Sequence, residues 1–199
     1  MRTSFSILLS ISICFAAQSA CAQTKPDVTR TTANTTQENH PVVVPIREKT
    51  DAGEIDSAYP EINKQAEILR RSFMAEDFER YADFMHPVAL EAVGGKKNFA
   101  ASLSNTRSSL RRNGFEFVSY TIGDPVQLLE IKDKLFAVLP YETKMRNSER
   151  TTTEVGNILA VSESNGKDWK FIRASSKERL RFLYPDVVDL LKFAESRAE

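Results

Sequence analysis

Four side chains combine an aromatic ring with a polar group and are the candidates for binding or chemistry: Tyr81, His86, Tyr141 and Trp169. An unperturbed histidine titrates close to neutrality, so His86 is the candidate for a general acid or base. The alternative role for a histidine before a proline is a turn that ends a helix. The two tyrosines and the tryptophan each have an apolar body and a polar tip that needs a partner, which suits the lining of a ligand site.

The catalytic hypothesis is a small-molecule isomerase, dehydratase or hydrolase that uses His86 with Tyr81 or Tyr141. A carboxylate base would have to join such a pair. Tyr141 and Glu142 are adjacent in a predicted strand and therefore face opposite sides. Tyr81 and Asp83 lie two apart in a predicted helix and point roughly 200° away from each other. No local catalytic set is formed, so the sequence favours a non-catalytic binding module. A periplasmic immunity or inhibitor protein is a further alternative.

Composition narrows the classes of partner. The chain has 199 residues, 41% hydrophobic and 27% charged, with a formal net charge of zero. A neutral chain has no electrostatic attraction to nucleic acid or to an anionic membrane surface. Both cysteines, Cys14 and Cys21, precede residue 23, so the remainder has no thiolate ligand or nucleophile. With one histidine in the predicted domain and no glycine-rich phosphate loop, we expect no metal site and no cofactor.

The first 22 residues are predicted to be an export signal. Arg2 supplies the positive start, and residues 5–17 form an apolar stretch too short to span a bilayer. Small residues at 20–22 then precede Gln23, which predicts cleavage after Ala22 and a periplasmic or extracellular protein. The alternative is a membrane-anchored lipoprotein, because residues 19–21 resemble the end of a lipobox that would lipidate Cys21.

The composition changes after the signal. Residues 23–57 are poor in large apolar side chains and rich in polar ones, which predicts a flexible linker. The short apolar run Val42–Val44 is either part of this linker or an added edge strand. Residues 58–199 are long enough to bury one core without disulfides. We therefore expect a single domain after the linker.

Three helices are predicted at the start of this domain. The first spans Tyr59–Met74, where apolar residues recur every three or four positions. Asp77 caps a second, shorter helix that ends at the His86-Pro87 pair. After a turn at Gly94-Gly95, a third helix carries Phe99 and Leu103 and stops at Asn113-Gly114, a sequence typical of a left-handed helix end.

Five strand patterns follow, at residues 114–122, 126–131, 134–145, 153–163 and 168–173. The last alternates strictly, so Trp169 and Phe171 share one face. Asn165-Gly166 predicts the turn that precedes it. Pro140 cannot donate to a ladder, which predicts an edge or a bulge that bends the sheet. A short terminal helix is predicted from Pro185, and the element order indicates an α+β domain.

The short helix that ends in His86-Pro87, followed by a long antiparallel meander that closes on residues 166–171, resembles the nuclear-transport-factor-2-like superfamily. The resemblance covers residues 58–173. It implies a cone-shaped α+β fold in which three N-terminal helices pack on a strongly bent, mainly antiparallel sheet. It also implies a pocket between helices and sheet, and often a homodimer formed through the sheet. Members include enzymes and non-catalytic proteins, so the fold alone does not select a function. The ligand that we expect is a small apolar molecule or a protein partner.

Overall fold

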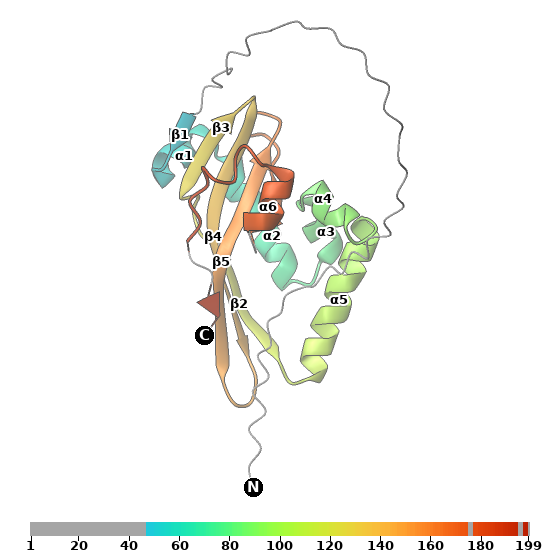
Figure 1. Cartoon of the computed structure of the whole chain (residues 1–199). Coiled ribbons are helices and arrows are strands. Elements are labelled where there is room, and N and C mark those ends of the chain that lie inside the picture. Colours follow the sequence, from blue (N-terminus) through green and yellow to red (C-terminus); the bar gives the residue numbers. More distant parts are fainter. Residues whose placement is uncertain (1–46, 175–176, 195–196, 199) are drawn as a thin grey trace, which may run out of the picture. The chain divides into compact units, whose positions relative to one another are not determined.

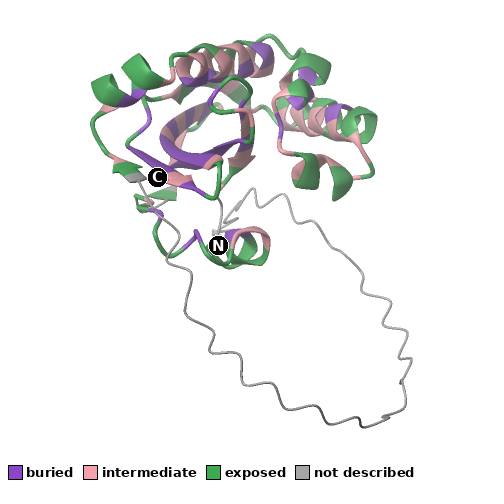
Figure 2. Cartoon of the chain, turned by 90° about the horizontal axis from the view of Figure 1, so that it is seen from above, coloured by how far each residue is buried: buried purple, intermediate pink, exposed green. Residues whose placement is uncertain are grey.

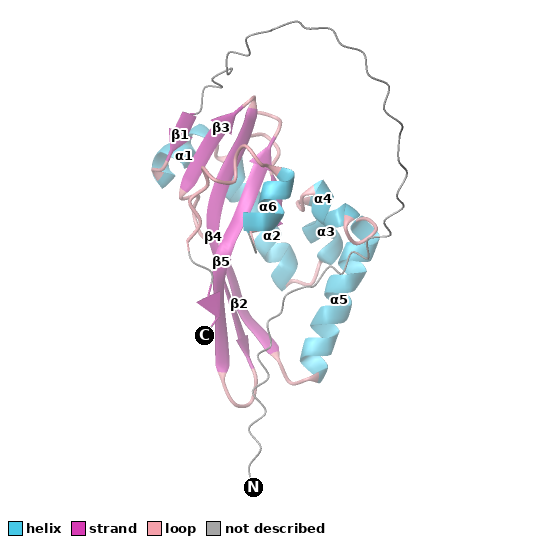
Figure 3. Cartoon of the chain, in the orientation of Figure 1, coloured by secondary structure: helices cyan, strands magenta, loops and turns pink. Residues whose placement is uncertain are grey.

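The computed structural model describes residues 47–174, 177–194 and 197–198, and the predicted signal, the lipidation site and most of the predicted linker lie outside them. Within the described residues the fold is α+β, as predicted, with helices first and an antiparallel sheet after them (Figure 1). Figure 3 shows that helices lie on both sides of the sheet. None of the helices in this part of the chain has both the length and the apolar character needed to cross a bilayer.

Six helices are described: α1 (Ala52–Ala58), α2 (Glu61–Met74), α3 (Phe78–Asp83), α4 (Pro87–Glu91), α5 (Lys96–Arg112) and α6 (Lys177–Leu183). The three predicted N-terminal helices are α2, α3 and α5. Asp77 caps α3 as expected, because its carboxylate accepts a hydrogen bond from the backbone N–H of Arg80. Gly114 follows the end of α5 with φ 77°, the left-handed conformation that glycine adopts without strain.

The sheet contains β1 (Arg47–Lys49), β2 (Glu116–Ile122), β3 (Gln127–Ile131), β4 (Lys134–Arg146), β5 (Thr151–Ser162), β6 (Lys170–Arg173) and β7 (Arg197–Ala198). Its main path runs β1-β3-β4-β5-β6, while β2 also pairs with β4 and β7 with β5. All five predicted strands are present. The turn at Asn165-Gly166 is also confirmed, within the longer loop of residues 163–169: both residues have positive φ, 53° and 81°, and the N–H of Lys167 donates to the Ser164 oxygen at 3.3 Å.

Pro140 marks the point at which β4 changes partner. Residues 134–138 of β4 pair with β3, and residues 141–146 pair with β2. Pro140 has no N–H to donate. It lies between the residues that pair with β3 and those that pair with β2, so neither ladder loses a hydrogen bond. The bulge lies elsewhere, between Phe117 and Ser119 of β2, where the register with β4 shifts. The edge or bulge predicted at Pro140 is therefore not found there, because Pro140 stays in register with Asn157 of β5 and the bulged strand is β2.

The sheet is buried on both faces where β3, β4, β5 and β6 lie together, at the top of Figure 1. Helices α1 to α5 cover one face, which we call the inner face, in a cluster that includes Ile62, Leu69 and Trp169. The other, outer face is covered by α6 and the segment after it, through Leu180, Val187 and Leu191 among others. Figure 2 shows buried residues concentrated on the strands and exposed residues on the outward sides of the helices.

Two boundaries differ from the sequence prediction. Regular structure is present from the first described residue, Arg47, inside the predicted linker of residues 23–57, because β1 pairs with β3 and Ile55 of α1 is fully buried. One apolar residue among polar ones gave too weak a pattern to identify α1. The terminal helix is α6, which ends before Pro185, whereas residues 185–190 form turns whose valines pack on the outer face.

Candidate functional site

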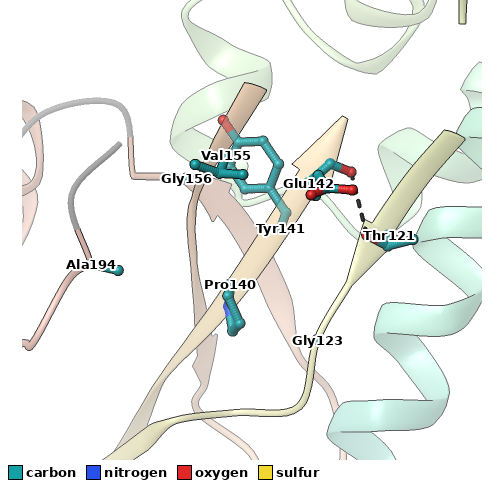
Figure 4. A pocket seen from close by; sticks show the side chains of 8 residues that line it. All are labelled: Thr121, Gly123, Pro140, Tyr141, Glu142, Val155, Gly156 and Ala194. Atoms are coloured by element: carbon teal, nitrogen blue, oxygen red, sulfur yellow. Dashed lines mark hydrogen bonds between the residues drawn. The ribbon is translucent and has the colours of Figure 1, made fainter. Parts of the chain in front are cut away.

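A pocket of about 290 Å³ lies on the outer face, beside the point where β4 exchanges β3 for β2 (Figure 4). Its lining comes from β2, β4, β5 and the C-terminal segment: Thr121, Gly123, Pro140, Tyr141, Glu142, Val155, Gly156 and Ala194. Among the described residues, α6 and the segment after it cover the outer face near β3 and β6. They do not cover the part of this face that lines the pocket. Its floor is largely apolar, which favours binding of an apolar body.

The polar groups of the pocket have partners in the protein. The Glu142 carboxylate pairs with the Lys144 ammonium at 3.0 Å, and the two side chains are 38% and 43% exposed. The Thr121 hydroxyl donates a long hydrogen bond of 3.5 Å to the backbone oxygen of Glu142. Exposed pairs of this kind contribute little to stability, so these groups can exchange partners with a ligand at small cost.

Tyr141 connects the pocket to the inner face. Figure 4 shows its ring directed toward Gly156 and away from Pro140. Gly156 lies opposite Tyr141 on β5, and a Cβ at this glycine would be 2.8 Å from the ring. The ring can therefore cross β5 only because the opposite residue has no side chain.

The Tyr141 hydroxyl lies beside the ion pair of Arg173 and Glu154. It accepts a hydrogen bond from Arg173 Nε at 2.6 Å and donates one to Glu154 Oε1 at 3.3 Å. Arg173 also bonds Glu154 directly, and its guanidinium lies 4.9 Å from the centre of the Tyr141 ring. Burial raises the pKa of Tyr141 to about 12, although the nearby Arg173 cation opposes the rise. The hydroxyl therefore stays protonated at neutral pH and can only donate or accept hydrogen bonds.

Tyr81 and Tyr141 are both neighbours of a third tyrosine, Tyr120. The Tyr81 ring, on α3, stacks on Phe99 and leans on Phe73 at 5.5 Å. Burial raises the pKa values of Tyr81 and Tyr120, which also share a hydrogen bond. The Tyr120 ring lies 6.2 Å from that of Tyr141. The three tyrosines are joined by ring contacts and by the bond between Tyr81 and Tyr120, and burial keeps them protonated, which suits a core and does not supply a base.

His86 lies at a different junction and has both ring nitrogens engaged. Nδ1 accepts from the N–H of Val88 and so caps α4, which assigns the proton to Nε2, 2.7 Å from the Tyr184 hydroxyl. Burial lowers the pKa of His86, while the Glu163 carboxylate raises it and Lys134 lowers it. Within the described residues, no hydrogen bond joins His86 to Tyr81 or Tyr141, so the structure does not bring the predicted catalytic pair together.

Trp169 is a core residue with no exposed surface. Its indole N–H donates to the backbone oxygen of Gly166 at 3.0 Å, and Gln65 bonds its backbone N–H. The polar tip thus finds its partner in the preceding turn. A buried indole leaves no surface for a ligand, and we do not place Trp169 in the site.

Sequence reasoning missed the residues that surround Tyr141. Arg173 and Glu154 lie on neighbouring strands, and only the register of β4, β5 and β6 brings them to the same hydroxyl. The one sequence signal was Gly156 inside an apolar strand, which is typical of a close approach by another group. Thr121 and Val155 gave no signal, because threonine and valine are ordinary strand residues.

Comparison with known proteins gives little further information. No family model matches the chain, and no curated protein matches it. A solved structure of Bdellovibrio bacteriovorus Bd1075 is similar to part of it, with a TM-score of 0.38 and 17% sequence identity. The match covers 62% of this chain and 42% of that one, so the chain spans less than half the length of this neighbour. A TM-score this low does not establish a common fold.

Proposed function

We propose that the chain is an exported, non-catalytic binding module whose site is the outer-face pocket. The observation that carries this proposal is the chemistry of the lining. Its floor is apolar, its carboxylate and hydroxyl are already paired, and burial raises the pKa of Tyr141 to about 12 and so keeps that hydroxyl protonated. A site of this kind can hold a ligand but has no group poised to transfer a proton at neutral pH.

The expected ligand is a small molecule with an apolar body. The volume of about 290 Å³ lies near the lower end of the range for small-molecule sites, and Thr121 and Glu142 at the edge can orient a polar group. Export is supported by the sequence of the first 22 residues. Membership of the nuclear-transport-factor-2-like superfamily is supported by the order of helices and antiparallel strands.

Nile red, a neutral dye that fluoresces in apolar surroundings, tests the pocket. Val155→Arg places a long charged side chain in the pocket lining and is expected to remove dye binding. Val118→Arg is the matched control, because Val118 is a 46% exposed valine on β2 that does not line the pocket. Equal binding by the wild-type protein and Val155→Arg, or equal loss in both variants, would contradict the proposed site.

Native mass spectrometry of the purified mature protein tests the same proposal without a dye. We expect a retained small molecule that is absent from Val155→Arg. The same spectrum reports whether the protein forms the homodimer that the resemblance implies. A wild-type protein that neither retains a ligand nor binds Nile red would overturn the proposed function.

A further inference from the structure

Arg107 on α5 is a largely covered cation whose hydrogen bonds are incomplete. Its side chain is 11% exposed, and its guanidinium lies 4.0 Å from the centre of the Phe117 ring and 5.5 Å from that of Phe73. Nε donates to Glu76 at 3.3 Å. Nη1 is the one buried side-chain nitrogen or oxygen in the described part of the chain that has no hydrogen-bond partner. Because an unpaired buried donor is costly, this atom points to a missing acceptor.

The charges around Arg107 are also unbalanced. Glu76 is shared between Arg107 and Arg111, so one carboxylate faces two guanidinium groups. Burial lowers the pKa of Arg107, while Glu76 raises it. Glu76 has φ 60° because it ends α2 in a left-handed cap, in which the N–H of Asp77 donates to the Ser72 oxygen at 2.9 Å. A second anion at this place would balance the charge.

Apolar side chains surround the guanidinium. Leu103 and Leu110 lie four residues before and three after Arg107, which places them beside it on the same face of α5. Both are half-buried and belong to neither core cluster, and Phe117 below them is also half-buried. Side chains outside a packed core can rotate aside at small cost, so we expect an incoming group to reach Nη1 between them.

We propose that Arg107 binds the carboxylate of a small apolar molecule where α5, β2 and the turn after α2 meet. The guanidinium donates to the carboxylate through Nη1, and the leucines and Phe117 cover the apolar body. This site lies on the inner side of β2 and is separate from the outer-face pocket. It does not depend on the function proposed for that pocket.

Isothermal titration with decanoate and decanol, below the concentrations at which they aggregate, tests the proposal. The two probes share an apolar chain and differ in the carboxylate. Because a hydrogen bond to a charged group is worth roughly tenfold or more in affinity, we expect decanoate to bind at least about tenfold more tightly than decanol. Equal affinities, or no binding of decanoate, would overturn the proposal.

Variants test whether Arg107 is the side chain that causes the preference for decanoate over decanol. Arg107→Met is expected to abolish the preference for decanoate. Arg111→Met is the matched control, because it removes a guanidinium that bonds the same Glu76 but is 65% exposed, and we expect it to keep the preference. If Arg107→Met does not fold, Arg107→Lys retains the charge without the planar fork and is expected to weaken decanoate binding severalfold. An unchanged preference in the folded Arg107 variant would refute the assignment, and Val155→Arg should leave decanoate binding intact.

Discussion

Replacing Gly156 by alanine tests whether the glycine exists to let Tyr141 cross β5. The new Cβ would lie 2.8 Å from both Cε1 and the hydroxyl oxygen of Tyr141, so the ring must move. Movement strains the hydrogen bonds to Arg173 and Glu154. Overpacking of this kind costs about 1–3 kcal/mol. Without this clash, alanine would raise the free energy of unfolding by up to about 1 kcal/mol, since it restricts the backbone of the unfolded chain more than glycine does. We expect a net loss of about 1–2 kcal/mol in the free energy of unfolding.

The assay is urea denaturation of a double-mutant cycle. Tyr141→Val removes the ring, so Gly156→Ala should be neutral or slightly stabilising in that background. The coupling between the two sites is then about 1–3 kcal/mol, well above the error for independent sites. If Gly156→Ala were harmless in the wild-type protein, or equally damaging without the ring, the steric explanation would be refuted.

Three further outcomes are expected. Because burial lowers the pKa of folded His86, its contribution to stability is fully present above about pH 6.5, its unfolded pKa, and is lost as the pH falls through the folded pKa. His86→Asn keeps a capping side chain and should lower the free energy of unfolding by about 1 kcal/mol at pH 7 through loss of the Tyr184 bond. Its stability should also fall less steeply in acid than that of the wild-type protein, and an identical acid profile would contradict this. Leu180→Ala should cost about 2–5 kcal/mol because Leu180 is 2% exposed, while Phe182→Ala, two residues later and 89% exposed, should change stability by less than about 0.5 kcal/mol in the same urea titrations. If cleavage follows Ala22, Cys21→Ser should leave the mass of the mature protein unchanged; a lipid-sized mass lost in that variant would favour the lipoprotein alternative.

Local signals account for most of the predicted elements. Asp77 and Gly114 act at the ends of helices through their own backbone neighbours, so a sequence pattern suffices to identify them. The strands carry enough branched and aromatic residues to be recognised. The short C-terminal helix was predicted from Pro185 but lies earlier, as α6, because its one buried residue, Leu180, gives no periodic stripe that would place it. The apolar residues after Pro185 have helical spacing, but they pack on the sheet as turns.

The candidate site depended on contacts that no local pattern contains. His86 was identified as the residue that ends a helix, and the structure adds that it caps the next one and bonds Tyr184, 98 residues away. Tyr141 was predicted as a ligand-binding residue whose polar tip needs a partner, and in the structure its hydroxyl has two partners within the protein. Its partners, Arg173 and Glu154, could not be named, because the register between strands fixes them.

The sequence by itself determined the α+β class, the five main strands and the three main helices, since each follows from propensity or period along a short stretch of chain. Only the tertiary structure decided where the pocket lies on the outer face, that Tyr141 passes over Gly156, and that the Arg107 guanidinium lies by two phenylalanines with one buried nitrogen unpaired. These features arise from residues distant in sequence. Packing brings them together, and packing is the sum of many weak, non-local contacts that a linear pattern does not encode.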